Sequence, residues 1–222
     1  ISRETLPTMS PGPPCYRCFH YPVNMMPPPG YIEMGFNFTE FAKSYTSSLT
    51  ETLANLPFSS MEKLWEIIET ARSQGSTVHF IGNGGSAGTP SHSAGDWSKE
   101  LSLRTISHVD NSPALTAWAN DTDFENIFVG QLSTFASRGD VVIGFSGSGN
   151  SANVINGIEY SKDNGCRTVA ITGNYRGMGG GKLAEIADLT ILVQSESMER
   201  IEDAQLVINH IIKEAVKSNN GL

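Results

Sequence analysis

Two pairs of ionisable side chains at helical spacing are the first candidates for chemistry in this sequence. His92 and Asp96 are four residues apart, so on a helix they would project from one face, about 40° from each other. Glu202 and His210 are eight apart, which on a helix separates them by about 80° in angle and ~12 Å along the axis. Imidazole and carboxylate groups are zinc ligands, and together they also form a general acid and base. Taken singly, each of these residues could equally be a polar residue at the edge of a core.

Two turns rich in glycine and serine could bind a phosphate group without a charged side chain. They are Gly82-Asn83-Gly84-Gly85-Ser86-Ala87 and Ser146-Gly147-Ser148-Gly149-Asn150-Ser151. Glycines let backbone N–H groups approach a ligand, hydroxyls add donors, and a helix N-terminus after the turn favours an anion. Neither turn has the Walker A or the dinucleotide-binding pattern, so a phosphorylated small molecule fits better than a nucleotide. Either turn alone could equally be a sharp connection between a strand and a helix.

The elements around these residues alternate between strands and helices. Short β-branched runs predict strands over residues 78–81, 105–109, 141–145, 168–172 and 189–193. Helical patterns predict helices over residues 37–56, from Ser59 to Gly75, and over 126–136, 151–164 and 199–217. This alternation predicts an α/β fold with a parallel sheet covered on both faces. In such sheets ligands bind beyond the carboxyl ends of the strands, where both glycine turns fall.

Capping and periodicity give further detail for three of the helices. Asn37 with Glu40 predicts the start of the first helix, and Ser59 with Glu62 predicts the start of the second. On the last helix, every third or fourth residue is apolar. This spacing predicts a core-facing stripe formed by Ile201, Ala204, Ile208, Ile211 and Ala215. Glu202 and His210 would then lie beside the stripe, near the rim of the core.

The composition is that of an ordinary globular protein. The chain has 222 residues, a formal net charge of −8 and 39% hydrophobic residues, so wholesale disorder is not expected. No stretch approaches the ~20 consecutive apolar residues of a membrane helix, and the acidic balance argues against nucleic-acid binding. Three cysteines are too few for a disulfide framework. These features predict a soluble cytoplasmic protein.

The first 36 residues differ from the rest. They hold eight of the eleven prolines and show no periodicity, so we expect residues 1–36 to be an irregular arm, a processed leader or a remnant of cloning. Met34 is a candidate start, and residues 37–222 form the expected domain. Cys15 and Cys18, followed by His20, have the spacing of half a zinc site. No second half-site follows nearby, so two incidental thiols are the simpler interpretation.

Six motifs along residues 37–217 occur in the order and spacing of one protein family. They are the two glycine turns, His92 with Asp96, Ala119-Asn120-Asp121 leading to Asn126-Ile127-Phe128, Gly180-Gly181-Lys182-Leu183-Ala184, and Arg200-Ile201 followed by His210. As a set they resemble the sugar-isomerase (SIS) domain proteins, specifically the sedoheptulose 7-phosphate isomerases, also called phosphoheptose isomerases. The first 36 residues have no counterpart in this resemblance.

The resemblance implies a fold, an assembly and an activity. The fold would be an SIS-type three-layer αβα sandwich with a five-stranded parallel sheet, preceded by N-terminal helices. The assembly would be a homotetramer with active sites built from more than one subunit. The activity would be the interconversion of D-sedoheptulose 7-phosphate and D-glycero-D-manno-heptose 7-phosphate through an enediol, an early step toward ADP- or GDP-linked heptose.

The resemblance also implies the site residues. Asp96 would be the base that acts on carbon, and His210 would move protons between the substrate oxygens. The ligands of a zinc ion would be His92, Asp96, Glu202 and His210. The phosphosugar would be held by Asn83, Gly84, Gly85, Ser86, Asn120, Asp121, Ser146, Gly147, Ser148, Ser151 and Glu202.

Four positions depart from the residues that are usual in the family. Asp96 replaces a glutamate, Glu202 a glutamine, Gly147 a threonine and Glu100 an arginine. The added negative charge favours a bound dication and disfavours a further phosphate. Two alternatives therefore stay open: an isomerase of another phosphosugar, and a non-catalytic adaptor resembling the DnaA initiator-associating proteins. An adaptor would need neither Asp96 nor His210.

Overall fold

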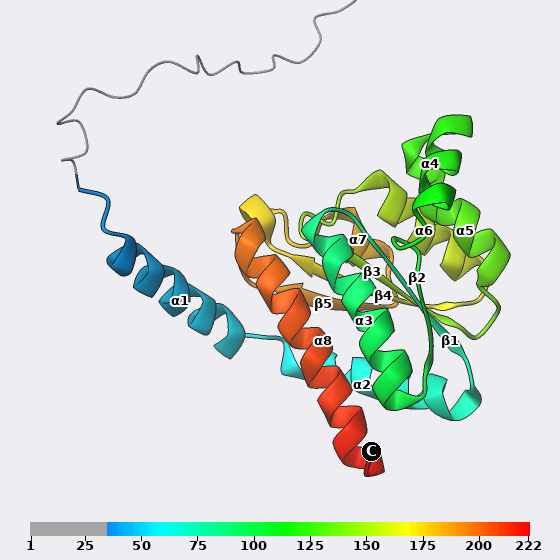
Figure 1. Cartoon of the computed structure of the whole chain (residues 1–222), viewed down its shortest axis with the longest axis horizontal. Helices are drawn as coiled ribbons and strands as arrows, with labels where there is room; N and C mark the ends of the chain where they lie inside the picture. The colour runs from blue at the N-terminus through cyan, green and yellow to red at the C-terminus, as the bar shows by residue number, and fades with distance from the viewer. Residues whose placement is uncertain (1–34) are drawn as a thin grey trace, which may run out of the picture. The chain divides into compact units, whose positions relative to one another are not determined.

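The computed structural model describes residues 35–222, in which eight α-helices and five β-strands follow one another (Figure 1). The elements are α1 Phe38–Ala54, α2 Phe58–Gln74, β1 Thr77–Gly82, α3 Gly85–Leu101, β2 Arg104–Ser107, α4 Ser112–Asp121, α5 Ile127–Phe135, β3 Val141–Ser146, α6 Ala152–Asp163, β4 Arg167–Gly173, α7 Gly181–Ile186, β5 Leu189–Val193 and α8 Met198–Asn220. The compact unit described below comprises Phe41–Leu222. The expected arm over residues 1–36, with Cys15 and Cys18, lies outside the described residues except for Gly35 and Phe36.

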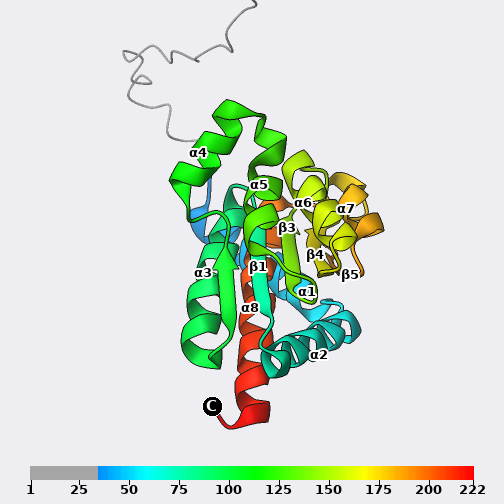
Figure 2. The ribbon, with the colours of Figure 1, turned by 90° about the vertical axis from the view of Figure 1, so that its right-hand side faces the viewer.

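The five strands form one parallel sheet in the order β2-β1-β3-β4-β5. One face packs against α2, α3 and α8 through a core that includes Phe80, Trp97 and Ile208, and the other packs against α5, α6 and α7 through Phe128 and Ile158 (Figure 1, Figure 2). The predicted three-layer α/β fold with a five-stranded parallel sheet is confirmed. No helix within residues 35–222 is long and apolar enough to cross a membrane.

The observed bounds differ from the predicted ones in ways that have physical causes. β2 ends at Ser107, two residues before the predicted end, and the next residue, His108, is buried and donates its backbone N–H to the Phe80 carbonyl oxygen at 3.0 Å. The second helix begins at Phe58 after Pro57, and no side chain caps it, so the predicted Ser59 cap is wrong. The helices α4 and α7 were not predicted, since both are short and carry little apolar periodicity.

The buried stripe of α8 also differs from the predicted one over its last two turns. Ile201, Ala204 and Ile208 are buried as predicted, but the stripe continues through Ile212 and Val216. Ile211 is 40% exposed. Because the apolar contacts repeat every four residues along this part of the helix, the buried face moves one residue beyond the predicted one.

A polar network of two histidines and an aspartate lies buried on the face of the sheet that packs against α5 and α6. The His79 Nδ1 atom lies 3.0 Å from His108 Nε2, and His79 Nε2 lies 3.3 Å from Asp140 Oδ2. Because the Asp140 carboxylate accepts hydrogen bonds, His79 donates from Nε2 and accepts at Nδ1 from His108. His108 Nδ1 is buried and has no hydrogen-bond partner among residues 35–222. Burial lowers the pKa of His79 and lowers the pKa of His108 to about 3.

These two histidines should make the fold sensitive to acid. The unfolded chain binds protons at histidine below about pH 6.5, whereas folded His108 stays neutral to about pH 3. The free energy of unfolding should therefore fall as the pH falls from 6.5 toward 3, by up to ~1.4 kcal/mol per pH unit for each neutral histidine. Urea unfolding at pH 7, 6 and 5 measures this slope. His108→Gln should flatten it, and equal slopes in the variant and the parent protein would contradict this assignment.

Candidate active site

The first glycine turn joins the end of β1 to the start of α3. Gly84 has φ of +56°, and a Cβ on Gly82 would lie 2.0 Å from the Ser86 carbonyl oxygen, so only glycine fits at this close approach. The α3 helix begins at Gly85, directly after the turn. Its first N–H groups have no partner within the helix, and the helix dipole is positive at this end. The turn is therefore a site for an anion or a carboxylate.

The second turn joins β3 to α6 and lies against α7. The Ser146 hydroxyl accepts a hydrogen bond from the Gly149 N–H at 3.1 Å and lies 3.3 Å from the Ser151 hydroxyl. Gly149 has φ of +67°, and its carbonyl oxygen accepts from the Leu183 N–H at 2.9 Å. These bonds hold the serine hydroxyls at one end of the sheet beside the first turn.

A hollow of about 220 Å³ lies between the two turns at the carboxyl ends of β1 and β3. Its lining includes nine of the predicted substrate-binding residues, namely Asn83, Gly84, Gly85, Ser86, Ser146, Gly147, Ser148, Ser151 and Glu202. Asn120 and Asp121 are not among the lining residues. They lie exposed on α4, where the Asn120 amide donates to the Asp121 carboxylate at 2.8 Å.

Glu202 lies with the first glycine turn. A Cβ on Gly85 would lie 2.3 Å from the Glu202 carboxyl carbon, and the Ser86 backbone N–H donates to that carboxylate. Burial and the neighbouring Glu199 and Asp203 carboxylates raise the pKa of Glu202 above its ordinary value. Its carboxylate therefore occupies the N-terminal end of α3, where an anion would bind.

The remaining predicted residues come together between α3 and α8. His92 Nε2 lies 3.0 Å from His210 Nε2 and 3.2 Å from Asp96 Oδ2, and His210 Nε2 lies 3.9 Å from the same oxygen. One donor atom from each residue lies within 4.8 Å of the other two. Two imidazole nitrogens and a carboxylate oxygen at these distances form a possible metal-binding triad. Glu202, the fourth predicted ligand, is not part of this group.

The sequence analysis missed one residue of this cluster, Lys213. It lies one turn beyond His210 on α8 and is 8% exposed, and its Nζ lies 3.2 Å from Asp96 Oδ2. A signal was present in the sequence, because a lysine three residues after His210 lies on the same helical face. A lysine at such a position is more often solvated, so the spacing from His210 alone does not identify Lys213 as part of the cluster.

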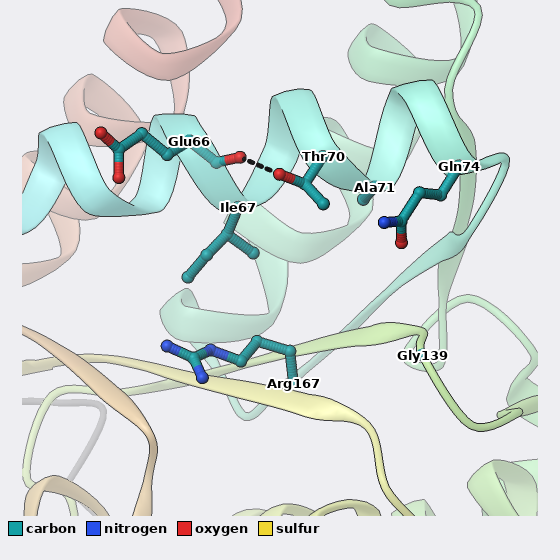
Figure 3. A pocket seen from close by; sticks show the side chains of 7 residues that line it. All are labelled: Glu66, Ile67, Thr70, Ala71, Gln74, Gly139 and Arg167. Atoms are coloured by element: carbon teal, nitrogen blue, oxygen red, sulfur yellow. Dashed lines mark hydrogen bonds between the residues drawn. The ribbon is translucent and has the colours of Figure 1, made fainter.

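A separate hollow of about 360 Å³ lies at the opposite edge of the sheet (Figure 3). It is bordered by Glu66 and Thr70 of α2, by Gly139, and by Arg167 at the start of β4. These residues adjoin the amino ends of strands, whereas ligands of parallel sheets bind at the carboxyl ends. The cluster and both glycine turns are absent from its lining, so we do not assign it to the reaction.

Comparisons with known proteins agree with this geometry. The SIS domain family matches residues 38–173. The phosphoheptose isomerase of Aquifex aeolicus is 40% identical over 156 residues, which cover 68% of this chain and 80% of the relative. The phosphoheptose isomerase of Aliarcobacter butzleri is 34% identical over 157 residues, which cover 68% of this chain and 81% of the relative.

Solved structures show the same fold. The phosphoheptose isomerase of Neisseria gonorrhoeae superposes with a TM-score of 0.77 at 24% identity, covering 82% of this chain and all of the other. That of Francisella tularensis gives a TM-score of 0.76 at 21% identity, again covering 82% of this chain. Since the SIS domain family matches residues 38–173 and both glycine turns lie at one end of the sheet, the chain belongs to the SIS-domain family, among the phosphoheptose isomerases.

Proposed function

We propose that this protein is an aldose–ketose isomerase that converts D-sedoheptulose 7-phosphate to D-glycero-D-manno-heptose 7-phosphate for activated-heptose biosynthesis. The observation that carries the proposal is the pairing of a phosphate-sized polar hollow with an imidazole–carboxylate cluster on the same two helices. Gly85 and His92 are seven residues apart on α3, which corresponds to ~10 Å along the axis. An extended seven-carbon chain with a terminal phosphate has a length on the order of 10 Å, at bond lengths of ~1.5 Å.

The hollow would hold the phosphate end of the sugar. The hydroxyls of Ser146, Ser148 and Ser151 in the second turn supply donors without adding positive charge, beside the first turn, whose helix end is occupied by Glu202. A protein of net charge −8 can thereby bind an anion locally. Binding energy gained at the phosphate orients the reacting carbons near α3 and α8.

Asp96 and His210 would carry the proton transfers. Starting from the ketose, Asp96 removes a proton from C1 while O2 gains one, which gives a 1,2-enediol. The proton on the carboxyl group then goes to C2 as O1 loses its proton, which completes the aldose. His210 moves the proton between O1 and O2, and the His92 nitrogen 3.0 Å from His210 Nε2 fixes its ring orientation.

The triad fits a zinc ion by the chemistry of its donors, since zinc binds imidazole nitrogen and carboxylate oxygen. We propose His92, Asp96 and His210 as its ligands and assign Glu202 to the phosphosugar hollow. When bound there, zinc would supply Lewis-acid polarisation of the substrate carbonyl.

We also propose that the enzyme works as a homotetramer in the cytoplasm, with residues 37–222 as the domain. An apolar groove of about 480 Å³ between α2 and α8, lined by Phe58, Trp65 and Ile211, supports an assembly. Phe58 is 58% exposed in the single chain, and such exposed apolar surface marks an interface. Sedimentation of the purified chain tests the assembly.

Proton NMR of D-sedoheptulose 7-phosphate incubated with the protein in D2O tests the function. We expect new heptose 7-phosphate signals with deuterium at C2, because the proton on the Asp96 carboxyl group exchanges with D2O before it goes to C2. Repeating the incubation with a chelator tests the role of metal. Turnover of a different phosphosugar would identify another substrate, and absence of exchange with every phosphosugar tried would favour the adaptor alternative.

A further inference from the structure

Lys213 is a buried cation in contact with the reaction centre. It lies on α8, is 8% exposed, and its ammonium group reaches across to α3, where it lies 3.2 Å from Asp96 Oδ2 and 3.3 Å from Glu100 Oε1. Its third carboxylate neighbour is Glu214 Oε1, at 3.4 Å. A buried ammonium is stable only when its charge is paired, so these contacts are a fixed part of the packing.

Lys217, one turn further along α8, provides a natural comparison. Its Nζ lies 2.7 Å from Glu100 Oε2 and 3.7 Å from Glu214 Oε1, and it is more exposed than Lys213. Both lysines therefore pair with Glu100, but Lys213 also contacts Asp96. The two lysines differ in their relation to the triad while carrying the same charge.

Three nitrogen atoms converge on one oxygen, Asp96 Oδ2. They are His92 Nε2 at 3.2 Å, Lys213 Nζ at 3.2 Å and His210 Nε2 at 3.9 Å. Because the Lys213 ammonium contacts the same Asp96 oxygen as the two imidazoles, a divalent cation held by the triad would lie close to a fixed positive charge. Like charges at such separations repel strongly where water is partly excluded.

We propose that the ammonium of Lys213 competes with a divalent metal for the Asp96 carboxylate. The affinity of the triad for metal is then set by a residue outside the ligand group. This inference rests on the proposed metal site, but it concerns binding of the metal alone and does not depend on which sugar the enzyme converts.

Titration of metal-free protein with Co²⁺, followed by the visible absorption of the bound ion, tests the proposal without any sugar. Lys213→Met keeps the side-chain length and removes the charge, so we expect it to bind Co²⁺ about 10-fold more tightly than the parent protein, a difference of ~1.4 kcal/mol. Lys217→Met removes the same charge one turn away and should stay within about twofold of the parent protein, because Lys217 pairs with Glu100 rather than with Asp96.

Two further variants separate charge from packing. Lys213→Arg retains the charge and should bind Co²⁺ like the parent protein. Lys213→Gln replaces Lys213→Met if circular dichroism shows that the methionine variant is unfolded. Unchanged or weaker Co²⁺ binding in the neutral variant, equal tightening in Lys213→Arg or Lys217→Met, or absence of Co²⁺ binding in every protein would each overturn the proposal. If Lys213→Met binds Co²⁺ more tightly as expected but the parent protein does not convert the heptose phosphate, only the proposed function is contradicted.

Discussion

His210→Ala is expected to lower kcat by about 10²- to 10⁴-fold while leaving the fold intact. In the proposed mechanism this imidazole moves a proton between the two oxygens of the enediol. Its Nε2 lies 3.0 Å from His92 and 3.9 Å from Asp96, so it is held beside the proposed base. Steady-state kinetics with D-sedoheptulose 7-phosphate, together with a thermal melt, measure both effects.

The same variant should change substrate affinity far less than turnover. His210 lies eight residues beyond Glu202 on α8, or ~12 Å along the axis from the hollow proposed for the phosphate. Ser218→Ala, at an exposed position of the same helix, is the matched control and should retain parental kcat. If His210→Ala turns over at nearly the parental rate, His210 has no part in the proton transfers.

The sequence predicted the end of the sheet at which both glycine turns lie. The strand and helix alternation predicts a parallel sheet, and ligands of such sheets bind at the carboxyl ends of the strands. Residues 82–87 and 146–151 follow β1 and β3, which are neighbours in the sheet, so the two turns had to meet. Because register within a parallel sheet depends on buried β-branched runs, the strand bounds were also predicted to within about two residues.

The sequence did not predict which residues of different helices contact one another. The spacing of His92 and Asp96 places them on one face of a helix, and that of Glu202 and His210 indicates a rise of ~12 Å, which is awkward for one metal. Neither spacing says which turn of α8 packs beside α3. The structure pairs His210 with His92, and it places Glu202 over Gly85 at the start of α3. Lys213 was missed for the same reason, because its partners Asp96 and Glu100 are on the other helix.

The error in the predicted apolar stripe of α8 shows how far a helical wheel can misplace the buried face. Ile211 and Ile212 are both apolar, and a helical wheel cannot decide which of the two faces the core once the contacts repeat every four residues. The structure buries Ile212 and leaves Ile211 40% exposed beside the groove of α2 and α8. One residue of shift along a helix turns a side chain by about 100°, which is enough to move it from a core to an interface.

Gly149→Ala is expected to weaken phosphosugar binding by at least ~10-fold, equivalent to ~1.4 kcal/mol. Gly149 has φ of +67°, and an added Cβ would lie 1.7 Å from the Gly180 carbonyl oxygen, which belongs to the backbone and cannot rotate away. The turn would have to move from α7, and the Ser146 and Ser148 hydroxyls would move with it. The positive φ and the clash together should lower the free energy of unfolding by about 2–4 kcal/mol.

Isothermal titration with the sugar phosphate and a thermal melt measure the two effects, and Gly88→Ala is the matched control. A Cβ on Gly88 would meet nothing within 4 Å, and Gly88 lies inside α3 just beyond the first turn. Alanine there should leave binding unchanged and stabilise the helix by up to ~1 kcal/mol. Parental affinity and melting temperature in Gly149→Ala would mean that the second turn can shift without loss. The serine hydroxyls would then not be held in place by the contact with α7.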